Sequence, residues 1–211
     1  MKKGKFIVIE GINGSGQRVK DGIVALHKAL VELGQDVVEC ANPDSGRAKE
    51  LGVASMLNWP FGKDARADFF FEGAVRAEIF RNVVLPALEQ EKIVICKQSS
   101  ISSLANAWVN GFTRNFDALR HLEKMSRGFL FDEEIFPDLT IFFDIPPEEA
   151  YERIEVIMQV HHEGGIEYYR KTRDYYLKEL PRWRGVRVDA SSSRPQEQID
   201  AEVLALVKAV L

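Results

Sequence analysis

The sequence predicts an α/β fold in which a five-stranded parallel sheet is covered by helices on both faces. Five short apolar runs are separated by longer amphipathic stretches, and strands that alternate with helices favour a parallel sheet with right-handed crossovers. A glycine-rich segment also follows the first apolar run and precedes a helical pattern. A chain of 211 residues is long enough to bury a substantial core, so residues 1–211 are predicted to form a single domain.

The predicted strands are nearly continuous apolar runs, as expected of strands that are buried on both faces. In chain order they are Lys5–Glu10, Asp36–Cys40, Lys92–Cys96, Asp138–Asp144 and Gly185–Asp189. Ligands of such sheets bind beyond the carboxyl ends of the strands. The segments expected to meet there are Glu10–Gly16, Cys40–Gly46, Cys96–Ser100 and Asp144–Pro147.

Helices are predicted from apolar residues that recur every three or four positions. After the glycine-rich segment, one such stripe faces the sheet and Gly34 ends the helix; it consists of Val19, Ile23, Leu26, Leu30 and Leu33. Residues 64–90 are predicted to be largely helical, and Pro146-Pro147 begins another helix. The last helix is expected to place Ile199, Val203, Leu206 and Val210 on one face.

The composition is that of a soluble globular protein, with 45% hydrophobic and 28% charged residues. A net charge of -4 gives no electrostatic reason to expect binding to nucleic acid or to an anionic membrane. No apolar run approaches the roughly 20 residues that a membrane-spanning helix needs. Cys40 and Cys96 each end an apolar run, which favours two buried reduced thiols in a cytoplasmic protein over a metal site.

The segment Gly11-Ile12-Asn13-Gly14-Ser15-Gly16 has the glycine spacing of a phosphate-binding loop, G-x-x-x-x-G-K-[ST]. Such glycines let backbone N–H groups surround a phosphate, while the following helix directs its positive end at it. The alternative is a glycine-rich turn that serves geometry alone. The position between a strand and an amphipathic helix favours the phosphate-binding loop, with Gly11, Asn13, Gly14, Ser15 and Gly16 as its residues.

The two positions that complete this motif carry other side chains, Gln17 and Arg18. A lysine at the first would neutralise the transferring phosphates, and a hydroxyl at the second would bind Mg²⁺; Gln17 is neutral and Arg18 repels a cation. Lys20 or Lys97 could replace the missing lysine, although a solvated Lys20 is the simpler interpretation. The loop is therefore predicted to hold an anion and to transfer it poorly.

Several ordered segments resemble the thymidylate kinase family over nearly the whole chain. They are KGKFIVIEGINGSG at the start, VVLPALEQEKIVIC before the third strand, SSLA (Ser102–Ala105), FPDLTIFFDIPPEEAYERI (Phe136–Ile154) and VDASSSRPQEQI near the end. The resemblance implies a P-loop fold, a flexible lid at about residues 155–167 and a homodimer. It also implies ATP and Mg²⁺ as cofactors in the conversion of ATP and dTMP into ADP and dTDP.

The same resemblance places altered residues at many positions of the family's site. Asn13 stands where the family has an acidic residue, Ala41-Asn42-Pro43 where it has Arg-Glu-Pro, and Lys97-Gln98-Ser99 where it has Asp-Arg-Tyr/His. Asn106-Ala107 replaces Tyr-Gln, and the lid has no arginine between Arg153 and Arg170.

Some remnants of that site are expected to persist. Arg76 matches the arginine that reads thymine, while Glu72 falls where a phenylalanine stacks on the base and Phe71 lies beside it. The full set of expected remnants of the nucleotide and substrate site is Glu10, Arg76, Phe71, Ser102 and Arg153.

These patterns predict a pseudoenzyme with no intact catalytic group, in which Gln17, Arg18, Lys97 and Gln98 mark degenerate positions. Its role would be binding, regulation or assembly, with a protein partner such as an active paralogue. Two alternatives remain: a nucleoside monophosphate kinase or other phosphate-binding enzyme with altered catalytic residues, and a nucleotide sensor that does not hydrolyse its ligand. His161-His162 is interpreted as a solvated pair rather than as a metal site.

Overall fold

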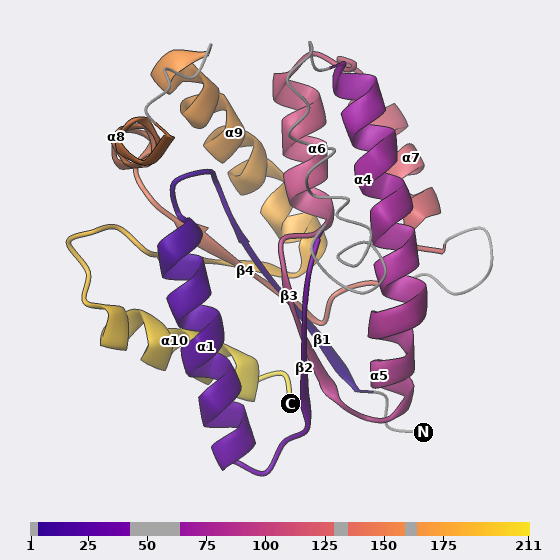
Figure 1. The fold of residues 1–211 in the computed structure, drawn as a ribbon, viewed down its shortest axis with the longest axis vertical. Coiled ribbons are helices and arrows are strands. Elements are labelled where there is room, and N and C mark those ends of the chain that lie inside the picture. Colours follow the sequence, from indigo (N-terminus) through magenta and orange to yellow (C-terminus); the bar gives the residue numbers. More distant parts are fainter. Residues whose placement is uncertain (1–3, 43–63, 129–134, 159–163) are drawn as a thin grey trace.

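A computed structural model describes residues 4–42, 64–128, 135–158 and 164–211. It contains one sheet of parallel strands in the order β2-β3-β1-β4-β5 (Figure 1). The strands are β1 (Lys5–Gly11), β2 (Val37–Ala41), β3 (Ile93–Lys97), β4 (Leu139–Asp144) and β5 (Gly185–Asp189). The predicted five-stranded parallel sheet is thereby confirmed.

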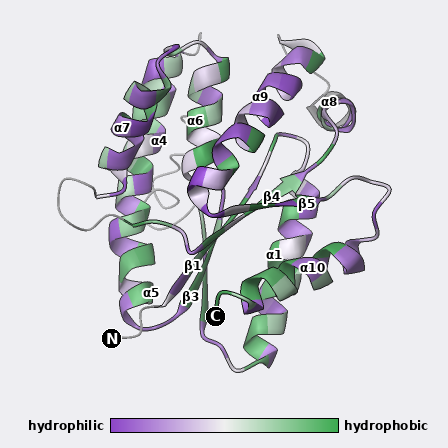
Figure 2. Cartoon of the chain, turned by 180° about the vertical axis from the view of Figure 1, so that it is seen from behind, coloured by the Kyte–Doolittle hydropathy of each residue, from purple (hydrophilic) through white to green (hydrophobic). Residues whose placement is uncertain are grey.

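Helices connect the strands and cover the sheet (Figure 1). They are α1 (Gly16–Glu32), α4 (Ala65–Ile79), α5 (Leu85–Glu89), α6 (Ser100–Val109), α7 (Phe116–Ser126), α8 (Pro147–Met158), α9 (Gly165–Glu179) and α10 (Gln196–Lys208). A π-helical stretch, Phe80–Val84, joins α4 to α5, and a 3-10 turn, Leu180–Trp183, ends α9. Figure 2 shows both hydrophobic and hydrophilic residues along α1 and α4, as expected of helices with one face on a sheet and one in solvent.

The side-chain alternation of the strands divides the core between the two faces of the sheet. Ile93 and Ile95 of β3 pack in one cluster with Val19 and Ile23 of α1. On the opposite face, Val94 and Cys96 pack with residues of α4, the π-helical stretch and α5. Helices α1 and α6 follow the neighbouring strands β1 and β3, and the crevice beyond the carboxyl ends of the strands is where an α/β sheet binds ligands.

Two helix predictions differ from the structure in detail. Leu33 is 49% exposed because α1 ends at Glu32, so Leu33 lies beyond the last turn that faces the sheet. In α10 the buried stripe is Ile199, Val203 and Val207, at steps of four. Leu206 and Val210, expected on that face, are only half-buried at its border.

Both cysteines are free and buried, which confirms the prediction of reduced thiols. Cys40 and Cys96 are register partners on β2 and β3. No helix among the described residues is long and apolar enough to cross a membrane. The turn predicted after Asn42, the lid residues 159–163 and His161-His162 lie outside the described part of the chain.

Candidate functional site

The glycine-rich segment forms a tight turn between β1 and α1. The Ser15 backbone N–H and hydroxyl both donate to the Ile12 carbonyl, at 3.0 and 2.7 Å. Gly14 has a φ of +92°, and a Cβ there would lie 2.6 Å from the Ala150 carbonyl oxygen. A Cβ on Gly11 would lie 2.2 Å from the Ser15 hydroxyl oxygen. Only glycine fits these two positions without a shift of the surroundings.

One side of this turn is open. A Cβ built on Gly16 meets no atom within 4 Å, and Gly16 begins the 17-residue helix α1. The first N–H groups of a helix lack intrahelical partners and carry partial positive charge. The open side of Gly16 and the start of α1 therefore suit an anion.

The side chains that follow the turn point to other partners. The Gln17 amide donates to Asp21 at 2.7 Å. The Arg18 guanidinium donates to Gln196 at 2.9 Å and to the carbonyls of Ser191 and Arg194 at 3.4 and 3.2 Å. Arg18 thus fastens α1 to the segment before α10. Lys20 is exposed on α1, in agreement with its interpretation as a solvated residue.

Arginines close to the turn are paired with carboxylates. Arg153 donates to the Gly14 carbonyl at 3.1 Å and forms an ion pair with Glu149. Arg173 binds Asp144 through two nitrogens, at 2.6 and 2.8 Å. Arg187 forms a further ion pair with Asp144 at 2.5 Å. The positive charge at this edge of the sheet is therefore largely matched by internal acids.

On the opposite face of β1, Glu10 is buried beneath the start of α6. Its carboxylate accepts hydrogen bonds from the Ser99 N–H at 3.0 Å and the Tyr176 hydroxyl at 3.2 Å. Burial raises the pKa of Glu10 to about 7. The Ser102 backbone also hydrogen-bonds to this carboxylate, and the Ser102 hydroxyl donates to the Ser99 carbonyl at 2.7 Å.

The end of β3 places Lys97 and Gln98 on either side of a bend. Lys97 follows the alternation of Ile93 and Ile95, so the half-buried lysine lies on the face covered by α1. Gln98 has a φ of +57°, a left-handed conformation that costs a non-glycine residue roughly 1–3 kcal/mol. The Gln98 N–H donates to the Ile9 carbonyl at 2.9 Å, which holds the bend against β1.

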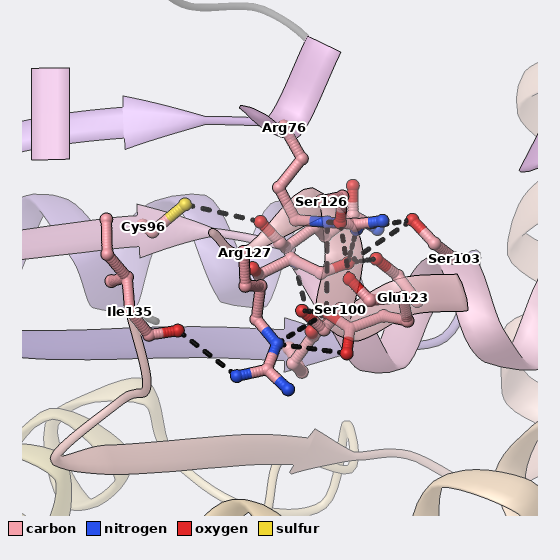
Figure 3. Close-up of polar contacts among 12 residues, drawn as sticks. Arg76, Cys96, Ser100, Ser103, Glu123, Ser126, Arg127 and Ile135 are labelled. Atoms are coloured by element: carbon pink, nitrogen blue, oxygen red, sulfur yellow. Dashed lines mark hydrogen bonds and ion pairs between the residues drawn. The ribbon is translucent and has the colours of Figure 1, made fainter. Parts of the chain in front are cut away.

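Arg76 descends from α4 into a buried polar cluster (Figure 3). Its Nε donates to Ser126 at 3.0 Å, and its Nη1 donates to the Ser103 hydroxyl and the Ser99 carbonyl at 2.9 and 3.2 Å. Phe71 packs instead against the core cluster below α4. Of the expected remnants, the fold therefore brings Glu10, Arg76 and Ser102 around Ser99, while Arg153 lies at the glycine-rich turn.

Known proteins match this chain over nearly its whole length. The family model described as thymidylate kinase matches residues 9–203. This chain belongs to the thymidylate kinase family. Among its curated relatives is a "Probable thymidylate kinase" of Pyrococcus abyssi, 30% identical over 98% of this chain and 97% of the relative. The thymidylate kinase of Pelotomaculum thermopropionicum is 32% identical over 99% of this chain and 95% of the relative.

For a thymidylate kinase family member, the residues present fit a nucleotide phosphate better than Mg²⁺. The open side of Gly16 and the start of α1 suit a phosphate. A magnesium ion requires oxygen ligands, yet Arg18 supplies a guanidinium and the Asp144 carboxylate is held between Arg173 and Arg187. Within the described ranges, no group of three or more His, Cys, Asp or Glu side chains could hold a metal ion.

The sequence analysis did not identify some residues of the buried polar cluster in this thymidylate kinase family member. Glu123 pairs with Arg127 through two hydrogen bonds of 2.8 and 2.9 Å and also accepts from the Ser100 hydroxyl (Figure 3). The spacing of Glu123 and Arg127, four residues apart, was the available signal. Tyr176 had no comparable signal, because its partner Glu10 lies 166 residues away.

Proposed function

We propose that this chain is a thymidylate kinase family member that has lost phosphoryl transfer and keeps a binding role. The observation that carries the proposal is the engagement of Gln17 with Asp21, and of Arg18 with Gln196 and two backbone carbonyls. These two positions complete the phosphate loop, and both side chains already have partners within the chain.

The expected loss of rate is large. Removal of one preorganised group that stabilises the transition state typically costs about 10²–10³ in rate. Phosphoryl transfer depends almost entirely on such groups and on metal ions that neutralise the developing charge. Gln17 contributes no charge, and the paired Asp144 carboxylate and the Arg18 guanidinium do not suit a metal ion. The charge of a lysine at the phosphate loop and the charge of a bound metal ion are therefore both expected to be missing.

A coupled assay for ADP release tests the proposal with ATP, Mg²⁺ and dTMP. We expect no turnover above the background of heat-denatured protein, while the Pelotomaculum thermopropionicum thymidylate kinase serves as positive control. Turnover in the usual kinase range of roughly 1–100 s⁻¹ would contradict the proposal.

A nucleotide sensor is the second candidate, favoured by the open side of Gly16. Because Arg18 replaces a metal ligand, ATP is expected to bind with a Kd that differs by less than about threefold between EDTA and excess Mg²⁺. Titration calorimetry under the two conditions measures this ratio. ATP binding that strictly requires Mg²⁺ would exclude the nucleotide sensor and would not by itself contradict the proposed loss of catalysis.

A homodimer in the cytoplasm, and a partner such as an active paralogue, remain proposals drawn from the family. Light scattering on the purified protein is expected to give twice the mass of one chain. A mass equal to one chain would contradict the homodimer and would leave the paralogue as the candidate partner, which co-purification with that protein can test.

A further inference from the structure

A small internal cavity lies between β1 and β4, beneath the start of α6. Its volume is about 10 Å³, and the described residues that line it are all buried. A buried water molecule needs roughly 10–15 Å³ of such space, together with two to four polar partners. The cavity therefore has room for one water molecule and is too small for a phosphate or an organic ligand.

One wall of this cavity carries a polar atom without a partner. The hydroxyl oxygen of Thr140 lines the cavity and has no hydrogen-bond partner in the part of the chain that the structure describes. Thr140 is only 1% exposed, so bulk solvent does not supply the missing partner. Because buried polar groups are nearly always hydrogen-bonded, this hydroxyl indicates that the cavity has a polar occupant.

Glu10 and Ser100 supply further polar groups to the cavity. Thr140 pairs with Val8 in the sheet, and side chains two positions apart on a strand share a face, so Glu10 lies on the same face as Thr140. The Glu10 carboxylate accepts from two backbone N–H groups and one hydroxyl, which leaves one of its four acceptor positions. The Ser100 hydroxyl donates to Glu123 and can still accept a hydrogen bond.

The same groups do not suit an ion. The guanidinium side chain of Arg127 also lines the cavity, and a divalent cation would need about six oxygen ligands where three side chains offer oxygen. An anion would lie beside the Glu10 carboxylate. A water molecule both donates and accepts hydrogen bonds, so it matches the Thr140 hydroxyl and the remaining acceptor position of Glu10.

We infer that one ordered water molecule binds in this cavity and bridges the Thr140 hydroxyl to the Glu10 carboxyl group. The bridge links β4 to β1 at the point where Glu10 also holds the Ser99 backbone before α6. Through Ser100 the water also reaches Glu123 in the buried polar cluster (Figure 3). This site is separate from the glycine-rich turn, and the inference does not depend on the proposed loss of phosphoryl transfer.

A high-resolution crystal structure of the full chain is the direct test. We expect one water peak within hydrogen-bond distance, about 2.7–3.2 Å, of both the Thr140 hydroxyl oxygen and a Glu10 carboxyl oxygen. A cavity without a peak, or a peak that contacts only one of these two groups, would overturn the inference.

Urea unfolding of two threonine variants tests the water in solution. Thr172→Val is the matched control, because the Thr172 hydroxyl is also buried and donates to the Tyr168 carbonyl at 2.7 Å. If a water molecule is the partner of Thr140, Thr140→Val also removes a hydrogen-bonded hydroxyl, and both variants are expected to unfold at lower urea concentration than the wild type. If the Thr140 hydroxyl has no partner, valine removes an unpaired polar group. An unchanged or higher midpoint in Thr140→Val would therefore overturn the inference.

Discussion

At the scale of single residues, the buried carboxyl of Glu10 makes stability depend on pH. Burial raises its pKa from 4.5 to about 7, so the folded chain keeps a proton that the unfolded chain releases. The stabilisation from this proton is complete below about pH 4.5 and is lost as the pH rises to about 7, a change on the order of 3 kcal/mol.

Urea unfolding at about pH 5 and pH 8 measures this effect. The free energy of unfolding of the wild type is expected to fall between the two values, and Glu10→Gln, which has no such proton to release, is expected to fall less. Glu32→Gln, at an exposed position of α1, is expected to behave as the wild type. An equal fall in Glu10→Gln would contradict the assignment.

Two lysines near the glycine-rich turn are expected to differ in their effect on phosphate binding. Lys97 is half-buried on the face that α1 covers, whereas Lys20 is exposed. Lys97→Gln is expected to weaken ATP binding by about three- to tenfold, and Lys20→Gln by less than twofold, because partly desolvated charges interact more strongly. Titration calorimetry in EDTA compares the two variants, and equal losses would refute a special role for Lys97.

At the scale of elements, two glycines of the β1–α1 turn are expected to serve different purposes, Gly14 in folding and Gly16 in phosphate binding. Gly14→Ala forces a Cβ to 2.6 Å from a backbone oxygen at a φ of +92° and is expected to destabilise the chain by more than about 1 kcal/mol. Gly16→Ala meets no neighbour and is expected to keep the stability but lose phosphate binding. Thermal unfolding and ATP titration of both variants measure the two effects, and retained ATP binding in Gly16→Ala would argue against a phosphate at this turn.

The buried C-terminal end of α7 depends on the ion pair of Glu123 and Arg127. Both side chains are buried, at 1% and 2% exposure, and removal of one partner of such a pair costs about 3–5 kcal/mol. Arg127→Ala is therefore expected to lower the free energy of unfolding by about that amount in urea titration. Arg66→Ala breaks an exposed ion pair with Asp64 on α4 and is expected to change stability little.

At the scale of the whole molecule, the sheet could be read from the sequence because buried parallel strands are continuous apolar runs. Helices α6 and α7 were harder to foresee. The first turn of α6 is rich in serine, which is neutral in helix propensity, and its side chains bond to the buried cluster rather than mark a helix. The local pattern therefore predicted the strands of the core but not helices α6 and α7.

The hydrogen-bond partners of the site side chains could not be predicted for a different reason. Arg18 bonds to Gln196 and to backbone carbonyls more than 170 positions away, and a backbone carbonyl has no signature in sequence. The unpartnered nitrogen of Arg76 likewise depends on three helices that meet only in the folded chain. The glycine spacing and the family resemblance indicated which positions had changed, and only the fold indicates what the new side chains do.

The facing thiols of Cys40 and Cys96 provide a natural reporter of local opening. They are register partners on β2, an edge strand, and β3, and the hydrogen bond with Cys40 together with burial raises the pKa of the Cys96 thiol. Neither thiol is expected to react with a disulfide reagent in the native state, because reaction requires an accessible thiolate. The slow rate of labelling would then measure how often the β2 edge detaches, and a ligand that binds across the carboxyl ends of β2 and β3 should slow that rate.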